Sequence, residues 1–368
     1  MILLRVFVFI LGLTVSLLSL ISGIRTFVLP RSSRDFVSSF VFRSLRRVFD
    51  FGLRWTDDFA TRDRVMAFYA PVSLLALLPT WLALVLIGYT GMFWGSGIES
   101  WEEAFRISGS SLLTLGYAKG DVLFHTALEF SEATLGLLLV ALLIAYLPTM
   151  YNAFSHRENA VNLLEVRAGN PPTAVEMIAR YSRIHGLAKL EEAWQQWEVW
   201  FAEIEESHTS LAALVFFRSS KPTQSWITAA GAILDAASLT LAVVDITWNP
   251  QAALCIRSGF LALRSITDFF RISYNRDPHY PEDAISISRE EFDLACEMLE
   301  AEGVPLRADR EQAWIDFAGW RVNYDAPLLV LCKITMAPPA PWSSAGSLRG
   351  MTINSLGRRK MVVKKKKK

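Results

Sequence analysis

The 368-residue sequence has few cysteines, no excess of one charge and none of the short motifs that mark common enzymes. Its three cysteines lie far apart and form no C-x-x-C pair, which argues against a disulfide framework and a cysteine zinc site. The net charge of +1 gives no field that would attract nucleic acid. No G-x-x-x-x-G-K-[ST], G-x-S-x-G or H-E-x-x-H motif occurs. We therefore expect no enzyme activity, no cofactor and no nucleic-acid partner.

A metal site has equally little support. Glu205 and His208 form one Glu-x-x-His, a spacing that places both side chains on one helix face. A di-iron bundle needs a second such pair and two further glutamates, and no second pair occurs. We therefore expect no protein metal site and interpret His208 as a surface or packing residue.

Long apolar runs are what the sequence does contain. Hydrophobic residues make up 52% of it, and three runs reach the roughly 20 residues that a membrane-spanning helix needs. They cover residues 1–24, 65–94 and about 129–151. The first run is either an uncleaved helix or a signal peptide, and the charges that follow it favour the uncleaved helix. The sequence thus predicts an all-α membrane protein.

The charges between the runs predict how the chain crosses the membrane. Residues 25–64 contain nine arginines, whereas residues 95–132 are mainly acidic. Basic loops remain in the cytoplasm, so we expect a multi-pass protein of the plasma or inner membrane with an external N-terminus and a cytoplasmic C-terminal domain. Apolar residues recur at helical spacing among the arginines. This segment is either a helix in the headgroup layer, bound to anionic lipid, or a packed helix of the cytoplasmic part.

The segment between the second and third runs carries the most information. Trp101, Phe105 and Leu112 suggest a short helix over residues 101–113, with Glu102 and Glu103 at its N-terminus. A loop follows before the third run begins. A short helix and a loop that start and end on the outer side are typical of a re-entrant segment, which is stable only where protein or a water-filled pathway surrounds it. The loop consists of Thr114, Leu115, Gly116, Tyr117, Ala118, Lys119, Gly120 and Asp121.

This loop resembles the T-V-G-Y-G-D filter of the potassium channel family. Its setting of outer helix, short helix, loop and inner helix is similar to the two-helix pore unit of prokaryotic members, and the resemblance covers about a quarter of the chain, residues 65–158. It implies a homotetramer that passes potassium through rings of backbone carbonyls. Thr114 would add its side-chain oxygen at the inner end, and Tyr117 would brace the loop against the short helix. Gly116 fits a position that needs positive φ.

The loop departs from the family pattern after the tyrosine. The family has a second glycine there, whereas this chain has Ala118 and then Lys119 before Gly120 and Asp121. A left-handed alanine costs roughly 1–2 kcal/mol, and lysines at the outer mouth would repel cations. The resemblance therefore implies a cation pore whose selectivity for potassium is in doubt.

Two residues of the third run are candidates for gating. Gly136 lies near the place of the family's hinge glycine, but a glycine there equally suits close helix packing. Pro148 either bends the inner helix at a gate or marks the end of that helix.

The second half of the chain reads as a helical domain over residues 152–336, followed by a linker and basic tail over residues 337–368. Two apolar runs, 226–248 and 252–272, predict a hairpin that either enters the bilayer or packs in a cytoplasmic bundle. We favour the bundle, with Asp235 paired to Arg264 and Asp245 to Arg257. Residues 290–302 and 309–331 predict two further helices. The lysines at the end of the tail either bind anionic lipid or remain in solution.

Two functions follow from these patterns. The first is a channel for monovalent cations, potassium foremost, with a cytoplasmic domain that regulates or assembles it. The alternative is a non-conducting membrane anchor or receptor derived from such a channel, which acts through its helical domain.

Overall fold

The structure, a computed structural model, describes residues 1–29 and 35–344. Within them the protein is all-helical, with 73% of residues in helices and no strand, which confirms the expected class. The chain forms two compact units. The first contains residues 1–154 and 210–217, and the second contains residues 155–209 and the described residues from 218 onward.

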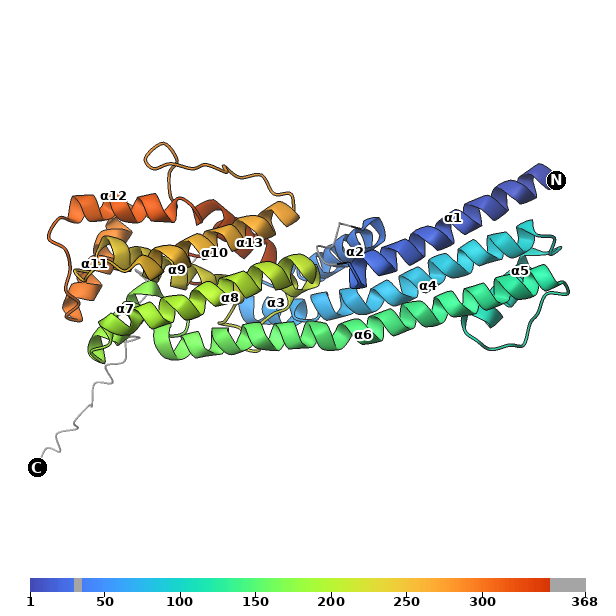
Figure 1. Cartoon of the computed structure of the whole chain (residues 1–368), viewed down its shortest axis with the longest axis horizontal. Helices are drawn as coiled ribbons and strands as arrows, with labels where there is room; N and C mark the ends of the chain where they lie inside the picture. The colour runs from blue at the N-terminus through green and yellow to red at the C-terminus, as the bar shows by residue number, and fades with distance from the viewer. Residues whose placement is uncertain (30–34, 345–368) are drawn as a thin grey trace, which may run out of the picture. The chain divides into compact units, whose positions relative to one another are not determined.

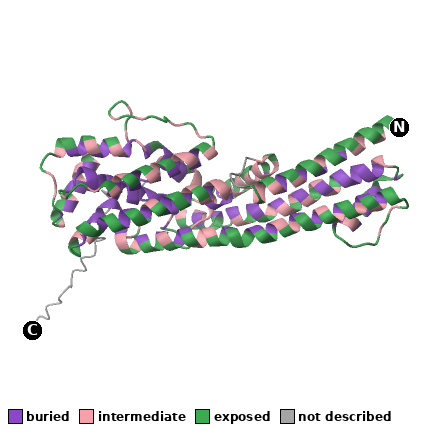
Figure 2. Cartoon of the chain, viewed as in Figure 1, coloured by how far each residue is buried: buried purple, intermediate pink, exposed green. Residues whose placement is uncertain are grey.

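The first unit holds the three apolar runs as helices (Figure 1). α1, α4 and α6 are long and apolar enough to cross a membrane, α4 together with the short α3 that precedes it. Only 17%, 33% and 28% of their most apolar windows are buried, and their outer faces are exposed (Figure 2). The elements are α1 (Ile2–Phe27), α2 (Phe36–Gly52), α3 (Phe59–Met66), α4 (Tyr69–Gly95), α5 (Trp101–Leu112) and α6 (Leu123–Ala168), whose last part belongs to the second unit.

Small residues bring α1 and α4 together. Gly12 of α1 faces Gly88 of α4 so closely that a Cβ added to Gly12 would lie 2.2 Å from the Gly88 carbonyl oxygen. A Cβ on Gly95 would lie 2.7 Å from the carbonyl oxygen of Arg5. Close backbone approach through glycine and serine is how helices associate in lipid, where no hydrophobic force joins them. The first helix is therefore an integral part of this unit.

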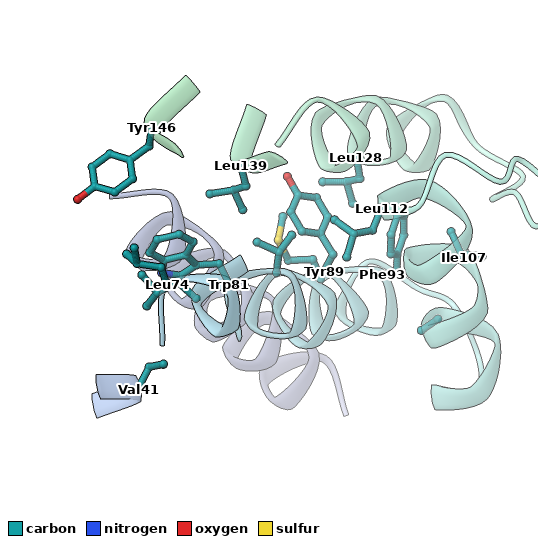
Figure 3. Close-up of a cluster of buried hydrophobic side chains, with 14 of the residues drawn as sticks. Val41, Leu74, Trp81, Tyr89, Phe93, Ile107, Leu112, Leu128, Leu139 and Tyr146 are labelled. Atoms are coloured by element: carbon teal, nitrogen blue, oxygen red, sulfur yellow. The ribbon is translucent and has the colours of Figure 1, made fainter. Parts of the chain in front are cut away.

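A cluster of large side chains fills the space between the helices of this unit (Figure 3). Trp81, fully buried on α4, packs edge-on against Phe27 and donates a hydrogen bond to Ser22 Oγ at 2.8 Å. Tyr89, also on α4, lies 2.9 Å from Ser131 Oγ of α6 through its hydroxyl. Each polar group of these aromatic residues thus has a partner in the apolar interior.

The arginine-rich segment forms α2, which packs along one side on the hydrophobic cluster of the first unit, while its contact with lipid headgroups stays a prediction. Val37, Val41 and Leu45 face the hydrophobic cluster, while Phe36 and Phe40 are 77% and 57% exposed. The helix begins with Asp35, whose carboxylate accepts the Ser38 amide. α2 therefore packs along one side and leaves a second apolar side, mixed with arginines, uncovered.

Residues 210–217, between the predicted helices of the second half, pack in the first unit. Leu214 is fully buried in the hydrophobic cluster. The ring of Phe216 lies 5.6 Å from Tyr69 at the start of α4, and Phe217 lies 5.8 Å from Phe154 on α6. The chain therefore returns to the first unit for eight residues, which the sequence analysis did not anticipate.

The second unit is built around α9 (Trp226–Ala242), every residue of which is buried. This apolar run is therefore the centre of a helical bundle, as expected, and has no face left for lipid. The remaining elements are α7 (Ala174–Arg183), η1 (Leu187–Lys189), α8 (Leu190–Ser210), η2 (Ala212–Phe216, in the first unit), α10 (Pro250–Phe269), α11 (Arg289–Ala301), α12 (Arg310–Arg321) and α13 (Asp325–Thr335).

The expected ion pairs of the hairpin are wrong. Asp235 pairs with Arg321 of α12, 2.5 Å away, and Arg264 instead donates to Asn323 O at 3.0 Å. No ion pair joins Asp245 to Arg257 within the described residues. Hairpin topology fixes which helices are neighbours, but the rotation of each helix, set by packing with α12 and α13, decides which charges meet.

Two predicted boundaries also change. The helix expected over residues 309–331 is broken at residues 322–324 into α12 and α13, which lets Arg321 and Asp325 form a buried pair at 2.7 Å. The expected linker is packed where the structure describes it: Trp342 is 6% exposed, and its carbonyl accepts a hydrogen bond from Arg321 at 2.6 Å. The basic tail, residues 345–368, lies outside the described residues.

Candidate functional site

The short helix α5 forms where the sequence predicts it. Ser100 accepts the Glu103 amide at 3.1 Å and caps its N-terminus, next to Glu102 and Glu103 in the first turn. Trp101 stacks on Trp94 at the end of α4, with ring centroids 4.7 Å apart. α5 is thereby fixed to the end of the span that precedes it.

Ser110 of α5 holds the loop that follows. This residue is buried, and its carbonyl oxygen accepts the amides of Leu115 at 2.8 Å and Gly116 at 3.4 Å. Its side-chain oxygen accepts the Ala118 amide at 3.1 Å. Three loop N–H groups thus point back to one residue of α5.

The carbonyl groups of the loop have no such partners. Among the described residues, none donates a hydrogen bond to the carbonyl oxygens of residues 114–117. Thr114 has φ of 56° and Gly116 has φ of 70°, while Leu115 and Tyr117 are not left-handed. The four carbonyl oxygens of residues 114–117 thus lie on an exposed part of the loop without an intramolecular donor.

The conformation agrees with the prediction at Gly116 and differs at its neighbours. The predicted positive φ is found at Gly116, and no atom outside its chain neighbours lies within 4 Å of a Cβ added there. Thr114 also takes a left-handed conformation, which the sequence did not indicate. Ala118 does not, so the expected strain at Ala118 is absent. The Thr114 hydroxyl donates to the Leu113 carbonyl at 2.7 Å.

Most of the loop is exposed. Tyr117 is 63% exposed and has no ring contact among the described residues, so it does not brace the loop against the chain's own α5. Leu113 and Leu115 are 57% and 60% exposed. Lys119 is exposed. Leu113, Leu115 and Tyr117 thus leave apolar surface of the loop uncovered.

Two glutamates of α6, not singled out from the sequence, contact this region. Glu129 accepts the Gly120 amide at 2.7 Å. Glu132 is completely buried, and its Oε1 lies 2.5 Å from Ser108 Oγ of α5. Ser108 Oγ also lies 3.1 Å from the Leu86 carbonyl of α4. The sequence signal for Glu132 was an acidic residue at the edge of an apolar run. Burying such a residue costs free energy, so its presence there usually indicates a function.

The two gating candidates behave differently. A Cβ on Gly136 would lie 2.9 Å from both the Leu112 carbonyl oxygen and Leu112 Cδ1, so the structure shows the close packing that was one of the two interpretations. Pro148 lies inside α6, which continues to Ala168. The interpretation that Pro148 marks the helix end is therefore wrong.

One face of α6 is an exposed apolar stripe. Phe130 (70% exposed), Leu137 (61%), Ile144 (64%) and Tyr151 (69%) recur every seven residues. Glu132, Gly136 and Leu139 lie on the buried side. A stripe of this length on a helix that can cross a membrane suits contact with lipid or with another copy of the chain.

No family model matches this chain, and comparison with curated proteins and solved structures finds no similar one.

Proposed function

We propose that four copies of this chain form a channel for monovalent cations, potassium foremost, whose pore is lined by the backbone carbonyls of residues 114–117. The observation that carries this proposal is the asymmetry of the loop: three of its N–H groups are bonded to Ser110, while the carbonyls of residues 114–117 have no donor among the described residues. Rings of such carbonyls replace the hydration shell of an ion. The location of the loop, between α5 and a helix able to cross a membrane, supports the same function.

Assembly follows from the surfaces that one copy leaves exposed. The α6 stripe and the loop residues Leu113, Leu115 and Tyr117 are apolar and uncovered. One loop supplies carbonyls on one side of an ion only, so a ring requires several copies around an axis. In this assembly the exposed Tyr117 contacts a neighbouring copy rather than its own α5.

Lys119 limits the rate at which cations enter this pore. It is exposed and follows the loop directly. Replacement by glutamine removes one positive charge per copy, so Lys119→Gln should raise cation flux severalfold at low salt and less at high salt, since salt screens the repulsion. A flux that does not depend on Lys119 at any ionic strength would show that this side chain lies away from the ion path.

Potassium flux into proteoliposomes tests the proposal. Gly116→Ala adds a Cβ at φ of 70° in open space, so it strains the loop without a steric clash. Gly52→Ala is the matched control, because no atom lies within 4 Å of its added Cβ and Gly52 lies far from the loop in sequence, at the end of α2. We expect flux in the intact protein and in Gly52→Ala, and its loss in Gly116→Ala. Equal flux in both variants would contradict a pore lined by this loop.

The second candidate function is a non-conducting anchor or receptor that acts through the helical second unit. Lys119 and the missing second glycine favour it, since both weaken a filter. The absence of flux from an assembled, folded protein under varied pH, lipid and voltage would support this function.

We also propose that the protein resides in the cell membrane with its second unit in the cytoplasm and α2 on anionic lipid headgroups. Thr26 of α1 bonds to Ser38 of α2 at 2.7 Å, and the Tyr69 hydroxyl of α4 donates to the Phe42 carbonyl at 3.1 Å. α2 is therefore fixed at the end where both spans leave the apolar layer, with Arg43 and Arg47 exposed. Fewer anionic lipids retained by Arg43→Gln/Arg47→Gln in native mass spectra would support this contact, and equal retention would contradict it.

A further inference from the structure

Glu132 is the only carboxylate in the described part of the first unit that is completely buried. It bonds to Ser108, which lies two positions before Ser110 on α5. A single hydroxyl, that of Ser108, lies within hydrogen-bond distance of Glu132 on α6 and of the Leu86 carbonyl on α4. It therefore links α5 to both long helices. Because Ser108 and Ser110 lie in the same turn of α5, a shift of Ser108 also moves the residue that holds three loop amides.

Glu129 acts on the other end of the loop. It lies one turn before Glu132 on α6, and its carboxylate accepts the amide of Gly120 directly at 2.7 Å. Consequently Leu115, Gly116 and Ala118 are held through Ser110 on α5, and Gly120 is held by Glu129 of α6. Both points depend on one stretch of α6, residues 129–132.

Neither carboxylate is aimed at the free carbonyls. Glu132 is buried against α5, on the side of α6 opposite the exposed stripe of Phe130 and Leu137. Glu129 is engaged with a backbone amide. A buried acid in an apolar segment costs free energy unless it has a partner, so its presence calls for a role.

We propose that Glu132 and Glu129 are positioning residues that hold the re-entrant loop in its ion-binding conformation, Glu132 through Ser108 and α5, and Glu129 through the Gly120 amide. The expected consequence of this restraint is selectivity between potassium and sodium, and this consequence rests on the proposed function. Its structural part, the restraint of the loop, is independent of conduction. The two parts can therefore fail separately.

Hydrogen exchange of the loop amides tests the restraint in the full-length protein. Glu132→Ala removes the partner of Ser108, and we expect exchange of the Leu115, Gly116 and Ala118 amides to rise about tenfold, the loss expected for one buried hydrogen bond. Glu132→Gln keeps a side-chain oxygen within reach of Ser108 and should retain protection within about twofold. Exposed Glu102 of α5, changed to glutamine, is the control and should change nothing. Unchanged exchange in Glu132→Ala would overturn the proposal whether or not the protein conducts.

Flux then tests the consequence. In variants that keep the mass and melting temperature of the intact protein, we expect Glu132→Ala to lower the ratio of potassium to sodium flux at least severalfold and Glu132→Gln to restore it. Ser108→Ala/Glu132→Ala should match Ser108→Ala alone, since both residues act through one contact. Additive effects, or an unchanged ratio in Glu132→Ala, would overturn the role in selectivity. Failure of the intact protein to conduct would instead contradict the proposed function and leave the exchange result to decide on the restraint.

Discussion

α9 of the second unit and the three long helices of the first unit are all apolar, yet they differ in how far they are buried. Every residue of α9 is buried among other helices of its own unit. The apolar windows of α1, α4 and α6 are at most one-third buried. An apolar run in the sequence therefore does not by itself distinguish a helix at the centre of a bundle from an exposed helix that is long enough to cross a membrane.

The two units also treat polar groups differently. The second unit buries Arg321 completely between Asp235 at 2.5 Å and Asp325 at 2.7 Å. Burial disfavours the charged guanidinium, yet Asp235 and then Asp325 outweigh burial and raise the pKa of Arg321. The first unit joins its helices through glycines, hydroxyl groups and the completely buried carboxyl group of Glu132. Charge is thus concentrated in the bundle core, whereas the apolar unit relies on close backbone contact.

Breaking the charged core should have the largest effect on stability. Arg321→Leu leaves Asp235 and Asp325 buried without a counter-charge, which should lower the free energy of unfolding by about 3–5 kcal/mol. Denaturant unfolding of the full-length protein, followed by tryptophan fluorescence, measures the change. The control is Glu311→Gln, which removes a largely exposed pair with Arg289 and should cost at most about 1 kcal/mol. Equal losses in the two variants would contradict the central role of the buried network.

Overpacking the glycine contact of the first unit should have the next largest effect. Gly12→Ala would place a methyl group 2.2 Å from the Gly88 carbonyl oxygen, so α1 and α4 must separate. We expect a loss of about 1–3 kcal/mol, read as a lower melting temperature in detergent. Gly52→Ala has no neighbouring atom within 4 Å and should be neutral or stabilising. A Gly12→Ala protein as stable as Gly52→Ala would show that α1 does not pack on α4 as described.

The smallest expected effect is a loss of stability of the second unit at acid pH. His208 is fully buried beside Trp226, and burial, followed by the charge of Arg157, lowers its pKa well below 6.5. The unfolded chain then binds a proton below about pH 6.5 that the folded chain does not, so stability falls with pH below this value and is constant above it.

The expected slope is about 1.4 kcal/mol per pH unit below pH 6.5. Unfolding midpoints at pH 7.5 and 5.5 measure it, and His208→Gln should reduce the difference between them. The exposed His279, changed to glutamine, serves as the control. If both variants lose as much stability between pH 7.5 and 5.5 as the intact protein does, His208 is not the source of that loss.

Sequence periodicity and hydropathy were enough to predict the long apolar helices and α5, and the resemblance of the loop to a filter predicted the positive φ at Gly116. They could not predict the partners of buried polar groups. Asp235 pairs with Arg321, 86 residues away in the chain, because helix rotation and the break after α12 bring them together. Glu132 was overlooked because it lies at the edge of the third apolar run, and its contact with Ser108 depends on how α5 packs. Residues 210–217 carry no sequence pattern that marks their return to the first unit.

The mass of the purified protein in lipid nanodiscs tests the central claim most directly. Carbonyls from one loop cannot surround an ion, so the account predicts particles that contain four copies of the 41.3 kDa chain. A homogeneous single copy, from protein that retains its helical content and melting transition, would contradict a pore shared between copies.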